Sequence, residues 1–133
     1  MLNYIKKLND NSLYISKNHN VIIIDTTFQK YINQYLNKNF TTIKTAEKSI
    51  KKQLGFKSKI PIYIDKYNLL MCIKSYRLEK SFYINYKSIY HYEIKNNYIY
   101  ISFVNHHQMK ITEKSAFISQ LNKCQKIIDY IND

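Results

Sequence analysis

The 133 residues of this chain include a single glycine (Gly55) and a single proline (Pro61), which restricts how its helices and strands can be connected. The turns must be made mainly by Asn, Asp and Ser, whose side chains bond to the nearby backbone. Clusters of these residues therefore mark the ends of the predicted elements. The chain has room for one domain with a substantial core, and we expect residues 1–133 to form that domain.

The segment before residue 40 is predicted to form a β-hairpin and then a short helix. The runs 12–16 and 21–25 are rich in strand-forming residues, and the polar residues between them suit a hairpin loop. Thr26 and Gln29 have the spacing of a capping box. Apolar residues then recur at helical spacing, which predicts a helix that ends near Lys38.

A second helix, predicted over residues 42–54, has a cationic side and an apolar side. At ~100° per residue, four lysines fall within an arc of about 100°, and four apolar residues gather opposite them. Gly55 suits the C-terminal cap of this helix. The lysines are Lys44, Lys48, Lys51 and Lys52, and the apolar residues are Ile43, Ala46, Ile50 and Leu54.

From Pro61 onward the pattern changes to strands, and Asn96-Asn97 suits a two-residue hairpin turn. A last helix is predicted over residues 115–130, with Phe117, Leu121, Cys124, Ile128 and Ile131 on its buried face. We therefore predict an α+β fold in which two N-terminal helices and a C-terminal packing helix accompany a curved antiparallel sheet or small roll. Its six-strand meander would comprise residues 61–65, 69–74, 81–86, 88–95, 98–104 and 108–112.

The charge of the chain points to a polyanionic partner. The formal net charge is +12, and acidic residues number nine. Residues 41–75 hold eight lysines against two acidic residues, Glu47 and Asp65. Lys, Ile, Asn and Tyr make up more than half of the chain and have A/T-rich codons, so genome composition accounts for part of this pattern. Genome composition explains the scarcity of acidic residues less well. The charge therefore favours a polyanionic partner, of which nucleic acid is the simplest.

Two cysteines, Cys72 and Cys124, are too few for a disulfide framework or a zinc site, and we expect both to be reduced core residues. The chain contains no run of eighteen apolar residues and does not start with a signal peptide, so we expect a cytoplasmic protein without a membrane span. The adjacent His106 and His107 lack further ligands nearby, and we expect neither a metal nor a cofactor.

With these elements placed, the chain resembles the ComK family of competence transcription factors from about Leu13 to about Ile128. The ordered set of segments carries the resemblance, because each is unspecific by itself. The segment Ser58-Lys59-Ile60-Pro61-Ile62, for example, is similar to the family's Ser-Lys-Pro-Pro-Ile strand entry. The other segments are the hairpin at residues 13–15 and 21–23, the helix at 45–49, and the strands at 82–85 and 101–105.

The resemblance implies a regulator that binds A/T-rich promoter boxes, largely from the minor groove, and activates DNA-uptake genes. Two differences indicate a shortened, divergent member. The family carries a longer segment, with a Gly-Arg/Lys-Lys cluster, where this chain has Lys51 to Lys57. The family's C-terminal extension has no counterpart after the last helix. A homo-oligomer or a complex with a regulatory protein is also compatible with the resemblance.

Nine basic residues are the predicted contacts with double-stranded, A/T-rich DNA. Lysines would bind phosphates, and the guanidinium of Arg77 would read a narrow minor groove. An ordinary solvated helix face is the alternative for the lysines, and one more surface charge is the alternative for Arg77. The nine residues are Lys44, Lys48, Lys51, Lys52, Lys57, Lys59, Lys74, Arg77 and Lys80.

Other functions are weaker alternatives. Tyr90, Tyr92, Tyr98 and Tyr100 alternate along a predicted hairpin; they could stack on single-stranded bases, but core packing is the commoner role and is our expectation. No nucleophile or phosphate-loop arrangement indicates an enzyme. A curved sheet with a C-terminal helix also suits a pleckstrin-homology-like module that binds an acidic protein or an anionic lipid. A truncated modulator of a full-length relative is the third possibility.

Overall fold

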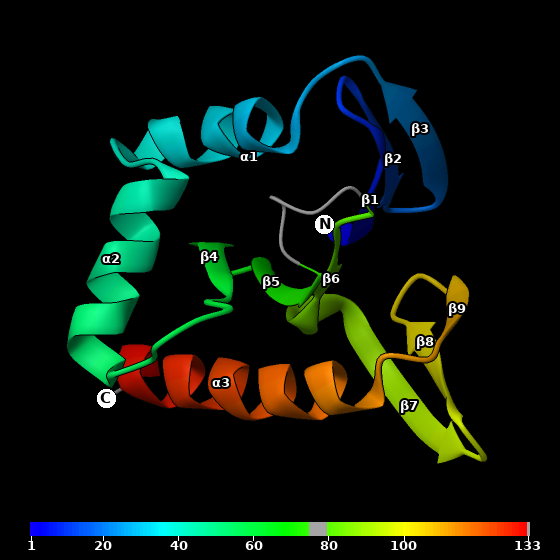
Figure 1. Cartoon of the computed structure of the whole chain (residues 1–133). Helices are drawn as coiled ribbons and strands as arrows, with labels where there is room; N and C mark the ends of the chain where they lie inside the picture. Colours follow the sequence, from blue (N-terminus) through cyan, green and yellow to red (C-terminus); the bar gives the residue numbers. More distant parts are fainter. Residues whose placement is uncertain (75–79, 133) are drawn as a thin grey trace.

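The computed structural model describes residues 1–74 and 80–132. Over these residues the chain forms an α+β fold with three α-helices and two antiparallel sheets, and the predicted fold class is confirmed. Figure 1 shows the helices on three sides of the strands, with α1 and α3 on opposite sides and α2 between them. The helices are α1 (Phe28–Leu36), α2 (Ile43–Leu54) and α3 (Lys114–Asn132), and two 3₁₀ turns are η1 (Asn37–Asn39) and η2 (Tyr86–Ser88).

The strands form a large sheet and a small sheet. The large sheet has the strand order β3-β2-β1-β6-β5-β4, and the small sheet has the order β7-β8-β9. The large sheet consists of β1 (Leu2–Asn9), β2 (Ser12–Lys17), β3 (Asn20–Ile24), β4 (Ile62–Asp65), β5 (Asn68–Lys74) and β6 (Phe82–Asn85). The small sheet consists of β7 (Ile89–Lys95), β8 (Tyr98–Phe103) and β9 (Gln108–Ile111).

The predicted six-strand meander is wrong, because the expected run divides between the two sheets. Its first three strands join the N-terminal hairpin through β1, a strand that the sequence analysis did not predict. Ile5 of β1 pairs with Ile15 of β2 on one side and with Tyr83 of β6 on the other. The pairing with β2 is a local hairpin around the turn residues Asp10 and Asn11, a signal that the sequence analysis missed. The pairing with β6 joins segments far apart in the sequence and leaves no local signal.

Side-chain and backbone caps define the predicted helix ends. Thr42 Oγ1 accepts a hydrogen bond from Thr45 N at 3.3 Å, and Gly55 ends α2 with φ of 73°. Both predicted ends of α2 are therefore confirmed. The cap of α1 is Thr27, whose Oγ1 accepts from Lys30 N at 3.2 Å, so the expected capping box at Thr26 begins one residue too early.

Apolar layers pack on both faces of the large sheet. On one face, Ile32 and Leu36 of α1 lie in a cluster that includes Leu70 and Cys72 of β5. On the other face, α3 and the small sheet cover a second cluster, which includes Leu69, Met71, Ile73, Ile101 and Phe117. Successive residues of a strand point to opposite faces, so β5 contributes to both layers and its apolar residues are buried throughout.

The buried stripe of α3 differs from the prediction at three of five positions. Phe117 and Cys124 are fully buried, as expected, but Leu121 and Ile128 are half-buried and Ile131 is exposed. Gln120 and Ile127 are buried in their place. The Gln120 side chain accepts from Cys72 N at 2.7 Å and donates to the Lys59 carbonyl at 2.7 Å. Gln120 is buried because it hydrogen-bonds to two backbone groups that are distant in the sequence. A prediction that relied on apolar residues alone could not place it in the buried stripe.

The expectation that four tyrosines of the second hairpin are core residues is also wrong. Tyr90, Tyr92, Tyr98 and Tyr100 are 37–78% exposed. Tyr92 lies on the α3 side of the small sheet, where its ring meets Phe117 edge-on at 5.2 Å, whereas Tyr98 and Tyr100 lie on the opposite face. The tyrosines therefore do not line one face.

Asn85, at the end of β6, holds four elements together through a buried side chain. Its Oδ1 accepts hydrogen bonds from Leu69 N at 2.9 Å and Lys87 N at 3.1 Å. Its Nδ2 donates to the Leu2 carbonyl at 2.7 Å and also approaches the Asn68 side chain at 3.1 Å. Asn85 thus joins β1, β5, β6 and η2, and it is the last residue of the Phe82-Tyr83-Ile84-Asn85 segment that carries part of the family resemblance.

The corner between α1 and α2 contains a strained aromatic residue. Phe40 has φ of 60° and is 97% exposed, although this left-handed conformation normally suits glycine or asparagine. Phe40→Gly should therefore raise the free energy of unfolding by roughly 0.5–1 kcal/mol, measured by urea unfolding. Phe40→Ala keeps the strain and serves as the control; equal effects of both changes would show that backbone strain is not the cause.

The two cysteines are free and buried, as predicted. Burial raises the pKa of both thiols, which keeps them protonated and unreactive. Of the helices in the described part of the chain, none is long and apolar enough to cross a membrane.

Candidate nucleic-acid interface

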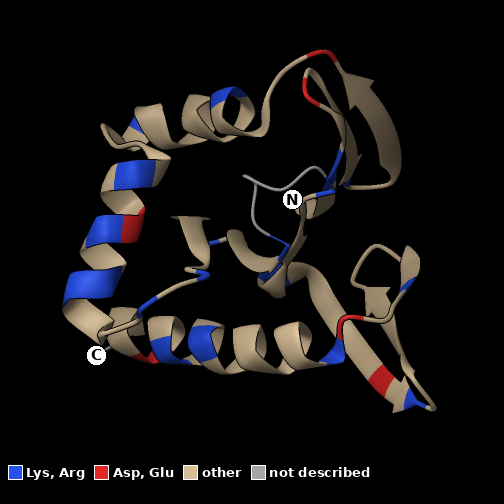
Figure 2. Ribbon diagram, in the orientation of Figure 1, with Lys and Arg blue, Asp and Glu red and all other residues tan. Residues whose placement is uncertain are grey.

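The lysines of α2 form an exposed row on the outside of the helix. Ile43 is buried and Ile50 and Leu54 are half-buried, so the apolar side of α2 faces the protein. Glu47 is the one acidic residue in the sequence of α2, and Figure 2 shows basic residues along its length. The exposed row, here called the α2 lysines, is Lys44, Lys48, Lys51 and Lys52.

The spacing of the α2 lysines suits a phosphate backbone. From Lys44 to Lys52 the helix rises by about 12 Å at ~1.5 Å per residue. Successive phosphates on one strand of B-DNA lie farther apart than the ~3.4 Å axial rise per nucleotide, because the strand winds around the axis, so the row is long enough to meet two neighbouring phosphates. Lys51 and Lys52 also lie in the last turn of α2, where positive charge stabilises the helix dipole, and they therefore have a structural role as well.

The loop after α2 extends this cationic surface toward α3. Lys57 and Lys59 are exposed, and the loop backbone is fastened to α3. Lys123 Nζ donates to the Ser58 carbonyl at 2.7 Å, and Gln120 Nε2 donates to the Lys59 carbonyl. Partial burial lowers the pKa of Lys123, and the positive charge of Lys59 acts in the same direction. The loop is thus held in place, and two more predicted contacts follow the α2 lysines.

Lys74 and Lys80 lie elsewhere, so the predicted contacts do not form one surface. Lys74 of β5 is half-buried and pairs with Glu113 at 3.4 Å. Lys80 lines a hollow of about 470 Å³ between the two sheets, and no residue of α2 lines that hollow. Arg77, the predicted groove reader, lies outside the described residues.

Several basic residues near these surfaces were missed by the sequence analysis. Lys6, Lys7 and Lys110 line the same hollow as Lys80, and Lys123 fastens the loop after α2. Lys6 and Lys7 belong to the unpredicted strand β1. Side chains alternate between the two faces of β9, and Lys110 lies on the exposed one. This alternation was the one sequence signal that could have placed Lys110 on an exposed face.

His107 has a structural role. Its Nδ1 lies 3.0 Å from the buried Ser16 Oγ, and its Nε2 lies 3.2 Å from the His19 carbonyl. The ring therefore links the β8–β9 turn to the first hairpin. Within residues 1–74 and 80–132, no group of three or more His, Cys, Asp or Glu side chains is arranged to hold a metal ion.

The fold and its surfaces define a basic α+β protein with exposed lysines on a helix and beside a sheet. The sequence matches the model of the ComK protein family over residues 3–133, and the chain belongs to this family. The match begins within β1, before the segments that carried the resemblance. No match was found among the curated proteins or among the solved structures. Membership in the ComK family indicates a competence transcription factor.

Proposed function

We propose that this protein is a DNA-binding transcriptional regulator of competence genes that acts in the cytoplasm on A/T-rich duplex DNA. The observation that carries the proposal is the exposed row of α2 lysines, which has one acidic residue in its helix. Lys57 and Lys59 continue the row into a loop held by α3. Family membership supports the same function.

In this proposal the lysines supply affinity and position, because phosphate contacts carry no direct sequence information. Preference for A/T-rich duplex would come from the shape and deformability of the DNA. Arg77 remains the sequence-based candidate for a side chain in the minor groove.

The alternatives predict different binding. The pleckstrin-homology-like hypothesis assumed one curved sheet closed by the last helix, whereas the described strands form two sheets and α3 packs against the large one. Anionic vesicles at matched ionic strength test lipid binding directly. A modulator that acts only through a full-length relative would not bind DNA by itself.

Charge reversal of two α2 lysines tests the proposal. Lys48→Glu with Lys51→Glu should abolish binding to an A/T-rich duplex at physiological salt, measured by fluorescence anisotropy. For the unmodified protein, neutralising about four to six phosphates gives a slope of log K against log salt of roughly −4 to −5. A flat salt response, or unchanged affinity of the double variant, would contradict the proposal.

A matched control replaces two lysines outside α2 with glutamate, so the net charge of the protein changes by the same amount. Lys30 and Lys114 are exposed residues near the starts of α1 and α3, where glutamate is favourable for the helix dipole. Lys30→Glu with Lys114→Glu should weaken duplex binding much less than the α2 double variant. Both double variants should remain folded, with unfolding free energies within about 1 kcal/mol of the unmodified protein.

A further inference from the structure

The open face of the small sheet carries aromatic and basic side chains together. Residues that pair across neighbouring strands point to the same side of a sheet. Tyr100 of β8 pairs with Glu93 of β7 and with Lys110 of β9, and Tyr98 pairs with Lys95. The opposite face of these strands carries Ile99, Ile101 and Ile111, which are buried. The tyrosines and lysines therefore share the face that points away from the core.

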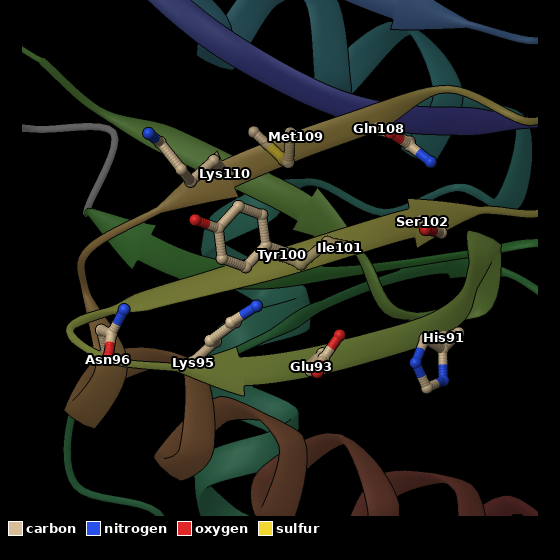
Figure 3. Close-up of a pocket in the computed structure, with 10 residues that line it drawn as sticks. All are labelled: His91, Glu93, Lys95, Asn96, Tyr100, Ile101, Ser102, Gln108, Met109 and Lys110. Atoms are coloured by element: carbon tan, nitrogen blue, oxygen red, sulfur yellow. The ribbon is translucent and has the colours of Figure 1, made fainter.

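This face is hollow, and Tyr100 lies at its centre. The hollow has a volume of about 660 Å³, within the ~300–1,000 Å³ typical of sites that enclose a small organic group. Figure 3 shows the Tyr100 ring between Lys110 of β9 and Lys95 of β7. Tyr100 is 43% exposed. The Lys110 ammonium lies 4.4 Å from the centre of the Tyr98 ring, whose centre is 6.4 Å from that of Tyr100.

A cationic path leads from this hollow to the second hollow between the sheets. Lys110 lines both, and the second hollow adds Lys6, Lys7 and Lys80 beside Tyr98. Two nearby acidic residues are paired with lysines: Asp10 with Lys7 at 3.6 Å, and Glu113 with Lys74. Glu93 is the one acidic residue among the described residues that line the first hollow. Positive charge therefore predominates along the path.

We propose that this face binds single-stranded nucleic acid. A base stacks on the Tyr100 ring, while Lys95 and Lys110 contact the phosphates on either side, and the strand continues toward Lys80 and Lys6. Glu93 repels phosphates, so the backbone passes beside it, and its carboxylate can accept hydrogen bonds from the amino groups of a base. This combination of stacking rings and a basic groove is the physical basis of single-strand binding.

The chemistry favours a single strand over other polyanions. In a duplex the faces of the bases are covered by their neighbours, so only the phosphates could meet this surface. An acidic peptide would meet the lysines but would place no base on Tyr100. The α2 lysines are not part of this site, so the inference is independent of the proposed duplex contact.

Tyr100→Ala tests the proposal with a labelled single strand of about 12 nucleotides, a length typical of such sites. Loss of one stacked base should lower affinity roughly 5- to 150-fold, whereas Tyr100→Phe should retain it. Tyr67→Ala is the matched control, because Tyr67 is 53% exposed and also carries a lysine ammonium, Lys66, 5.0 Å from its ring centre. It should leave single-strand affinity unchanged.

An abasic strand of the same length separates stacking from charge. It should bind the unmodified protein more weakly, and Tyr100→Ala should then have no further effect. Unchanged binding of the normal strand by a folded Tyr100→Ala variant would overturn the proposal. The proposal would also be overturned if Tyr100→Ala lowered the affinity for the abasic strand, or for duplex, as much as the affinity for the normal single strand. In the Lys48→Glu, Lys51→Glu background, Tyr100→Ala should still lower the affinity for single strands. The experiment therefore distinguishes failure of the proposed duplex contact at α2 from failure of the proposed single-strand site.

Discussion

Asn85→Ala should lower the free energy of unfolding by roughly 3–5 kcal/mol, a large fraction of the ~5–15 kcal/mol that stabilises a typical domain. The Asn85 side chain is fully buried and satisfies the N–H groups of Leu69 and Lys87 together with the Leu2 carbonyl. Alanine would leave these groups without partners, and each buried unsatisfied group costs ~1–3 kcal/mol. Urea unfolding followed by circular dichroism measures the change.

Asn122→Ala is the matched control for this variant. Asn122 is exposed on α3, and its loss should change the unfolding free energy by no more than about 0.5 kcal/mol. If Asn85→Ala costs less than ~1 kcal/mol, the hydrogen bonds around Asn85 do not hold β1 against β5 and β6.

Ile127→Ala should lower the unfolding free energy by roughly 2–5 kcal/mol, whereas Ile131→Ala should change it by less than about 0.5 kcal/mol. The two residues have the same side chain and lie one turn apart on α3, but Ile127 is 2% exposed and Ile131 is 45% exposed. Truncation at Ile127 removes packed methyl groups and leaves a cavity, while the Ile131 side chain already contacts water. Urea unfolding of the two variants under identical conditions provides the comparison.

Leu121 and Ile128 provide an intermediate case. The sequence pattern placed both on the buried face of the last helix, but their partial burial reduces the expected loss on truncation to alanine to roughly 1–2 kcal/mol. Equal losses at Ile127 and Ile131 would mean that α3 does not pack on β5 through the observed stripe.

The two proposed binding surfaces differ in their chemistry. The α2 lysines, which we propose contact the duplex backbone, lack aromatic neighbours on their helix. The small sheet combines lysines with exposed tyrosine rings and a hollow of limited size. A regulator with both surfaces would hold duplex DNA and an unpaired strand at different places.

Much of the α2 surface was predictable from the sequence. Lys44, Lys48, Lys51 and Lys52 are exposed because helical periodicity sorts side chains by angle, whatever the helix packs against. The Lys95–Tyr100–Lys110 arrangement was not predictable in the same way. Its three members come from different strands. The predicted Asn96-Asn97 turn sets Lys95 of β7 opposite Tyr98 of β8, but the pairing of β9 with β8 and the side of the sheet that faces the core depend on the tertiary structure.

The sequence by itself determined the local elements: the ends of α2 at Thr42 and Gly55, the first hairpin and the strand runs after Pro61. Those signals arise from residues within a few positions of one another. Only the tertiary structure decided that β1 also pairs with β6, that Gln120 is buried in α3, and that Tyr98 and Tyr100 face outward. Each of these depends on a partner far away in the chain, and periodicity along the sequence contains no information about which distant segments pair.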